Sequence, residues 1–181
     1  MEYANSIDSP IDIHAEDEWG FTGACSSGNI GLVKFLIDYA NSIGSSIDIH
    51  KDSERGFANA CYYGHIKLVE FLLEYANSID SPIDIHARRE WGFTNACYCG
   101  DIELVKFLLN YAKSINSPID IHADKSDGFL QACAKNNIHI IQLLIDESIC
   151  IMSPTKWDTY LIQNLLNKLC IFINTTIYYS E

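Results

Sequence analysis

Residues capable of chemistry recur at a constant interval of 36 positions along this chain of 181 residues. One series pairs each histidine with an aspartate two positions before it, and the other consists of cysteines. The histidines are His14, His50, His86 and His122, the aspartates are Asp12, Asp48, Asp84 and Asp120, and the cysteines are Cys25, Cys61, Cys97 and Cys133. Histidine beside a carboxylate could bind a metal ion or transfer protons, and a thiolate could act as a nucleophile or a metal ligand.

The constant spacing argues against chemistry shared within either series. Helices that pack on one another lie roughly 10 Å apart, whereas the ligands of a metal ion lie within about 2–2.3 Å of it. The same separation is too large for a disulfide between successive cysteines. We therefore predict that the histidines bond to the backbone of connecting segments, and that the cysteines are buried, reduced thiols.

Other signatures of catalysis are missing from the sequence. It contains no glycine-rich phosphate-binding loop and no Gly-x-Ser-x-Gly motif. The pair Cys97 and Cys99 is too closely spaced for a standard zinc site. We expect no catalytic residue, no metal site and no cofactor, and we predict that the protein is not an enzyme.

The elements that position these residues can be predicted from the third unit of the repeat. Residues 83–87 form a short, β-capable segment, and residues 90–99 form a short helix that Gly100 ends in the left-handed conformation. Asp101 then caps a second helix, in which apolar residues recur at helical spacing up to Ala112. Such a helix pair cannot bury its apolar side alone and must pack on its neighbours. The same stop and cap recur in the other units as Gly28-Asn29, Gly64-His65 and, with asparagine in place of glycine, Asn136.

The pattern over about residues 7–148 resembles the ankyrin repeat. The Ala-x-x-x-Gly spacing of Ala96 and Gly100 matches the first helix and turn of that family, and Leu-Val-x-x-Leu-Leu at residues 104–109 matches its second helix. The variant looks most like ankyrin-repeat proteins of giant DNA viruses. It departs from the family in two ways: Thr-Pro-Leu-His is replaced by Trp-Gly-Phe-Thr at residues 91–94, and the unit has 36 rather than about 33 residues.

The resemblance implies an all-α ankyrin-repeat solenoid of four helix-turn-helix units with a C-terminal capping helix. The repeats would occupy residues 1–150, and the helical cap and tail residues 151–181. The units would span about 7–42, 43–78, 79–114 and 115–150. Because no polar N-terminal cap repeat is visible, we expect the first helix pair to expose apolar surface and to allow weak self-association.

Composition limits the classes of partner. The chain has 12 basic and 24 acidic residues, a formal net charge of -12, and such a surface repels nucleic-acid phosphates and anionic lipid. We therefore expect neither nucleic acid nor membrane as a partner. No signal peptide and no long apolar span is visible, which indicates a cytoplasmic location, in the host cytoplasm if the viral resemblance holds.

The positions that differ from unit to unit predict where a partner binds. Tryptophan, tyrosine and arginine are enriched at interface hot spots, and the resemblance places them on the concave face. The candidate residues are Trp19, Arg55, Tyr62, Tyr63, Arg88, Arg89, Trp91 and Tyr98. The predicted function is non-catalytic recognition of a partner protein, a host protein if the chain is viral. The alternative for the aromatic residues is that some of them pack between adjacent units. The alternative functions are a substrate adaptor for a cullin-type ubiquitin ligase that uses the C-terminal segment, and a self-assembling repeat scaffold.

Overall fold

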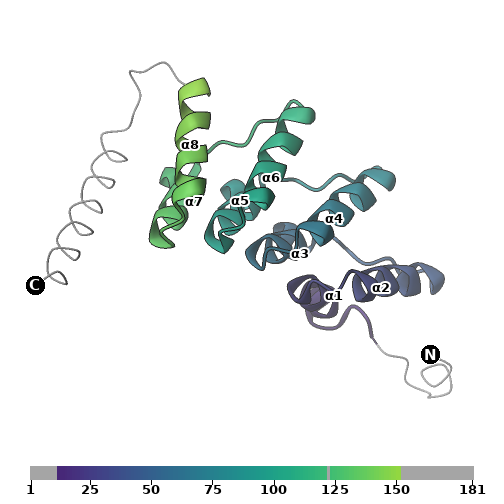
Figure 1. Ribbon diagram of the computed structural model, residues 1–181. Helices are drawn as coiled ribbons and strands as arrows, with labels where there is room; N and C mark the ends of the chain where they lie inside the picture. Colours follow the sequence, from purple (N-terminus) through teal and green to yellow (C-terminus); the bar gives the residue numbers. More distant parts are fainter. Residues whose placement is uncertain (1–11, 122, 152–181) are drawn as a thin grey trace, which may run out of the picture. The chain divides into compact units, whose positions relative to one another are not determined.

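A computed structural model describes residues 12–121 and 123–151 of the chain. All regular structure in these residues is α-helical (Figure 1). The first helices of the units are α1 (Ala15–Ser27), α3 (Lys51–Tyr62), α5 (Ala87–Cys99) and α7 (Ala123–Ala134), and the second helices are α2 (Ile30–Ser42), α4 (Ile66–Ser78), α6 (Ile102–Ser114) and α8 (Ile138–Ile151). The predicted all-α class is therefore confirmed for the described residues.

The chain divides into two compact units, Met1–Ile141 and Gln142–Glu181, and α8 contributes residues to both. Within the first unit, α3 packs on α1, α5 on α3, and α7 on α5. Each of α2, α4 and α6 packs on the first helix that precedes it, and α2 also contacts α4. Figure 1 shows α1, α3 and α5 as successive neighbours. The capping helix predicted after residue 151 lies outside the described residues.

Phenylalanine and glycine interlock between neighbouring first helices. Phe21, Phe57 and Phe93 are at most 3% exposed, and each ring lies against a glycine within the first helix of the next unit. A Cβ atom added to Gly56 would lie 2.8 Å from Cε1 of Phe21, which is closer than real Cβ contacts. The recurrence of glycine at this position therefore comes from the close approach of the first helices.

The predicted ends of the helices are largely confirmed. Gly100 adopts φ of +88° at the end of α5, and Asn136 adopts φ of +54° at the corresponding place after α7. Asp101 accepts hydrogen bonds from the amides of Glu103 and Leu104 and so caps α6. These residues satisfy groups that a helix end would otherwise leave without partners.

One local prediction is wrong. The side chain of His65 does not cap α4; instead its Nε2 lies 2.9 Å from the carbonyl oxygen of Ser26, to which it donates across the units. The β-capable segment at 83–87 forms no strand, as the all-α class requires, and the side chains of Ile83 and Ile85 are buried.

The first helix pair exposes apolar surface, as the sequence predicted. Leu32 of α2 is 41% exposed, whereas Leu68 and Leu104 at the equivalent positions of α4 and α6 are at most 1% exposed. Phe35 is exposed as well. Among the described residues, no helix combines the length and the apolar character needed to cross a membrane.

Candidate functional site

A buried glutamate organises the start of each of the first three units. In the second unit, Oε1 of Glu54 lies 2.8 Å from Nδ1 of His50 and accepts a hydrogen bond of 3.1 Å from the amide of Asp84. Nε2 of the same histidine lies 2.9 Å from the hydroxyl of Ser81. Because Ser81 and Asp84 belong to the connector that leads into the third unit, this Glu–His clamp ties one unit to the next. The equivalent clamps are Glu18, His14, Ser45 and Asp48 in the first unit, and Glu90, His86, Ser117 and Asp120 in the third.

The clamp corrects the prediction that the histidine side chains bond to backbone groups. In the three described cases they bond to glutamate and serine side chains, because burial of the glutamate brings a carboxylate within reach of the ring. These glutamates were not among the predicted site residues, although they lie four residues after each histidine and share the 36-residue period. The fourth unit has Ser126 at this position.

The clamps do not assemble into a reactive centre. Among the residues that the structure describes, no group of three histidine, cysteine or acidic side chains could hold a metal ion. Oε2 of each clamp glutamate is buried without a hydrogen-bond partner, which is costly and is tolerated where the rest of the group is fixed. The hydrogen bond to Glu18 raises the pKa of His14 above its usual value, against the opposing effect of burial. We assign the clamps a structural role.

The periodic cysteines are packed thiols. Cys25, Cys61 and Cys97 are completely buried and free of disulfides. Removal from water disfavours the thiolate, so burial raises the pKa of Cys25 to about 12 and raises those of Cys61 and Cys97 further. Thiols of this kind are poor nucleophiles at neutral pH.

A left-handed backbone turn precedes the regular part of α3 and of α5. Arg88, Arg89 and Glu90 have φ values of 49°, 57° and 66°, and Asp52, Ser53 and Glu54 adopt a matching conformation. Left-handed conformations cost about 1–2 kcal/mol per residue outside glycine, and the clamp supplies the hydrogen bonds that hold them. In each turn the glutamate is buried, whereas Asp52, Arg88 and Arg89 are exposed.

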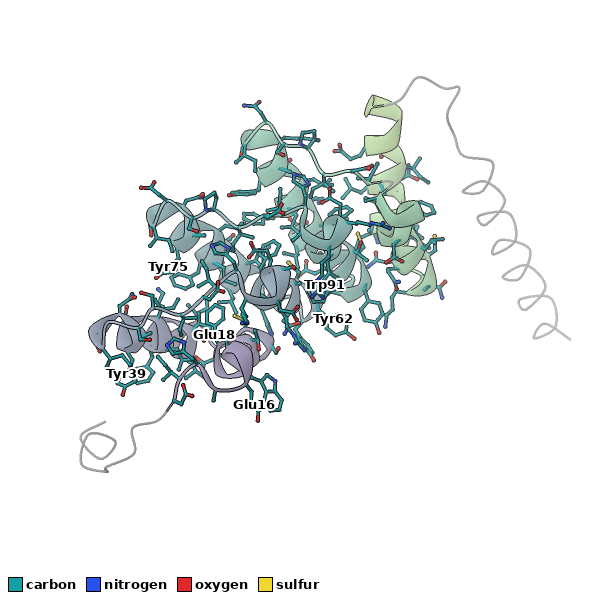
Figure 2. The ribbon with its side chains drawn as sticks, turned by 180° about the vertical axis from the view of Figure 1, so that it is seen from behind. Glu16, Glu18, Tyr39, Tyr62, Tyr75 and Trp91 are labelled. Atoms are coloured by element: carbon teal, nitrogen blue, oxygen red, sulfur yellow. The ribbon has the colours of Figure 1, made fainter. Side chains whose placement is uncertain are left out.

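All eight candidate residues lie on or directly after α1, α3 and α5, and none belongs to the core. Trp19, Arg55, Tyr62, Tyr63, Arg88 and Arg89 are exposed, and Trp91 and Tyr98 are partly exposed. In Figure 2, Trp91 and Tyr62 lie toward one side of the structure, and Tyr39 and Tyr75 of the second helices lie toward the other.

The structure brings four of the candidates together: Trp19, Arg55, Arg88 and Trp91. Arg89 follows Arg88 in the same left-handed turn, and these five residues are called the arginine–tryptophan strip. Arg55 pairs with Asp52 at 3.2 Å, and Arg88 from the next unit pairs with the same carboxylate. The guanidinium of Arg88 also lies over the ring of Trp91, 4.7 Å from its centroid. The strip is thereby continuous from α3 to α5.

An open pocket of about 270 Å³ lies beside this strip, between α1 and α3. It is lined by Glu16, Trp19, Thr22, Lys51, Asp52 and Arg55. Trp19 is 63% exposed, so its ring offers apolar surface at the edge of the pocket.

The remaining three candidates form a tyrosine cluster: Tyr62, Tyr63 and Tyr98. The rings of Tyr62 and Tyr98 stack across two units with their centroids 5.0 Å apart, and Tyr63 meets Tyr62 edge-on at 4.9 Å. The ammonium of Lys135 lies 4.0 Å from the centroid of Tyr98. A hydrogen bond between the Tyr62 and Tyr98 side chains lowers the pKa of Tyr98 and raises the pKa of Tyr62. The positive charge of Lys135 lowers the pKa of Tyr98 as well.

The strip and the tyrosine cluster lie on the same side of the first helices. Trp91 and Tyr98 are seven residues apart, which corresponds to two helical turns and about 10 Å along α5. Arg55 and Tyr62 have the same relation on α3. The packing between units that the sequence left as an alternative applies to Tyr62 and Tyr98, although Tyr62 is exposed and Tyr98 is partly exposed.

No protein-family model, no curated protein and no solved structure matches this chain.

Proposed function

We propose that this chain is an ankyrin-type repeat protein whose helix pairs stack as a solenoid, and that it binds a partner protein without catalysing a reaction. The single observation that carries the proposal is the accessible side of α1, α3 and α5. There, side chains typical of interface hot spots gather over two stretches of the same helices.

The contrast between fixed and variable positions supports this proposal. Apolar positions that repeat in the units, such as Phe57 and Cys61, are buried and hold the helices together. Positions that change, such as Trp19, Arg55 and Trp91, are wholly or partly exposed. A repeat protein uses its extended surface for recognition, and variation at exposed positions gives that surface its specificity.

The proposed partner is a cytoplasmic protein, and a host protein if the chain is viral. The resemblance to viral ankyrin proteins and the net charge of -12 both favour a protein partner over nucleic acid. Self-association remains a second candidate function, since Leu32 and Phe35 of α2 are exposed. The adaptor alternative depends on residues after 151, which lie outside the described residues.

Site-specific photo-crosslinking tests the proposal. Benzoylphenylalanine replaces Tyr62 in one variant and Tyr75, on the second helix α4, in another. Both proteins are exposed to cell lysate and irradiated, and crosslinked products are identified by mass spectrometry. We expect a discrete heterologous product from position 62 and none from position 75. Equal products from both positions would refute the assignment of the surface, and a product containing only this chain would favour self-association.

A further inference from the structure

We propose that the arginine–tryptophan strip binds an acidic linear segment of the partner protein. At least two aspartate or glutamate side chains of that segment pair with the guanidinium groups, and one apolar side chain contacts Trp19 at the pocket between α1 and α3. This inference depends on the proposed function and specifies the chemistry of the partner.

The distribution of charge is the first argument. The chain carries twice as many acidic as basic residues, yet all three of its arginines, Arg55, Arg88 and Arg89, lie at the starts of two adjacent first helices. The lysines are more widely spread: Lys51 also lies at the start of α3, but Lys67 lies on α4 and Lys106 on α6. Arginine forms bidentate hydrogen bonds with carboxylates that lysine does not form.

The hydrogen-bonding capacity of the arginines is the second argument. Arg55 and Arg88 share the single carboxylate of Asp52, so these three groups together carry a net positive charge. Each guanidinium has five N–H donors, and the two side chains are 50% and 45% exposed. Donors therefore face solvent. The ring of Trp91 holds the guanidinium of Arg88 on one side, and Asp52 takes up only part of the donors of the two arginines.

The pocket supplies the third argument. Its volume of about 270 Å³ is just below the range for drug-sized ligands, roughly 300–1,000 Å³, and it suits one side chain of a peptide. Trp19 provides apolar contact area on the side of α1, and Arg55 lies on the side of α3. A segment that crosses from α1 to α5 would meet the apolar surface first and the guanidinium groups next.

The surrounding carboxylates favour a peptide over nucleic acid. Glu16 and Asp52 line the same pocket, and the protein as a whole has a net charge of -12. Double-stranded DNA carries one charge per about 1.7 Å, so a polyphosphate would extend from the arginines onto this acidic surface. A short peptide can instead limit its negative charges to the positions that face the arginines.

The test selects ligands without assuming a sequence. A phage library of short random peptides is panned on the full-length protein, and the most enriched peptide is synthesised with a fluorescent label for anisotropy titration. We expect enriched peptides to combine acidic residues with an apolar residue. The double variant Arg55→Gln/Arg88→Gln should weaken binding by about tenfold or more, as expected for lost charge-assisted hydrogen bonds.

Matched variants separate the strip from overall charge and from misfolding. Lys67→Gln/Lys106→Gln removes the same number of charges from α4 and α6 and should leave the affinity unchanged. Asp52→Asn removes the carboxylate that competes with the peptide, and asparagine tolerates the left-handed backbone at this position. We expect Asp52→Asn to bind the peptide more tightly than the wild type.

Other outcomes would overturn the inference. Enriched peptides without acidic residues, no enrichment on the wild type over the double variant, or weaker binding by Asp52→Asn would each do so. Arginine-dependent binding of a labelled single-stranded oligonucleotide, tighter than that of the peptides, would identify the strip as a nucleic-acid site instead. The crosslinking at position 62 tests the proposed function separately, since Tyr62 lies in the tyrosine cluster and not in the strip.

Discussion

The interlocking of phenylalanine with glycine predicts a graded response to glycine-to-alanine substitution along the repeat. The perturbation is one methyl group at four equivalent positions: Gly20, Gly56, Gly92 and Gly128. A Cβ at Gly20 would meet nothing within 4 Å, whereas at Gly56 it would lie 2.8 Å from Phe21, and at Gly92 it would approach Phe57 more closely still. At Gly128 the nearest atom, in Phe93, lies at 3.2 Å.

The expected magnitudes follow from two opposing effects. Alanine is favoured over glycine within a helix by about 1 kcal/mol, and this gain applies at Gly20 without cost. Overpacking of a tight core costs about 1–3 kcal/mol, which cancels or exceeds the same gain at Gly56 and Gly92. We therefore expect Gly20→Ala to stabilise the protein, Gly128→Ala to be near neutral, and Gly56→Ala and Gly92→Ala to be less stable than Gly20→Ala by about 1–3 kcal/mol.

Urea unfolding followed by circular dichroism measures these differences, and thermal midpoints give a second readout. For a protein of this size, 1 kcal/mol corresponds to a shift of about 2–4 °C in Tm. Equal effects at all four positions would refute the interlocking, because helix propensity alone would then account for the results. Stabilisation by Gly92→Ala as large as that by Gly20→Ala would refute it as well.

Three further predictions concern the clamps and the thiols. Glu54→Ala should destabilise the protein by about 2 kcal/mol, since it leaves the amide of Asp84 and the ring of His50 without their acceptor. Glu54→Gln keeps that acceptor and should therefore lose less stability in the same urea titration. An equal loss of stability in the two variants would contradict the clamp. The pKa of His14, measured by NMR titration, should lie above 6.5 and fall in Glu18→Gln. Because the folded-state pKa is raised, the stabilisation from this histidine is complete below its unfolded pKa of about 6.5 and is lost as the pH rises through the folded value. The Tm difference between wild type and His14→Gln should therefore shrink as the pH rises, and a difference that grows with pH would contradict the raised pKa. Cys25, Cys61 and Cys97 should react with iodoacetamide at neutral pH only after urea is added, as judged by mass spectrometry of the labelled peptides; rapid labelling of the native protein would contradict their assignment as packed thiols.

Much of the fold could be predicted because the sequence repeats its own signals. Gly100 and Asp101 mark a helix end and a helix start by rules that depend on nearby residues only. The cap expected from His65 failed because its ring finds a better partner in the carbonyl of Ser26, which comes from another unit. Local rules cannot anticipate such a competitor.

The clamps could not be predicted from local propensity. Glu54 and Glu90 would ordinarily be placed on the solvated side of a helix, and burial of both depends on a left-handed turn that three successive non-glycine residues rarely adopt. Only the common period of the glutamates, and their spacing of four residues from the histidines, signalled the contact.

Exposure of the candidate surface could be predicted in outline, but its contacts could not. Asp52 and Arg88 occupy equivalent positions in successive units, as do Tyr62 and Tyr98. Equivalent residues are too far apart to share a metal ion when their side chains are short. The long side chain of Arg88 nevertheless bridges this separation to Asp52, and the rings of the two tyrosines fill it.

The most direct test of recognition through the first helices compares two triple variants in affinity capture from cell lysate with quantitative mass spectrometry. One variant, Arg88→Gln/Trp91→Ala/Tyr98→Ala, alters the candidate surface, and the other, Lys67→Gln/Lys106→Gln/Tyr75→Ala, makes comparable changes on the second helices. Circular dichroism first establishes that both are as helical as the wild type. We predict that a specific protein is held by the wild type and by the second variant and is lost from the first. Retention of that protein by the first variant, or its loss from both, would contradict the account.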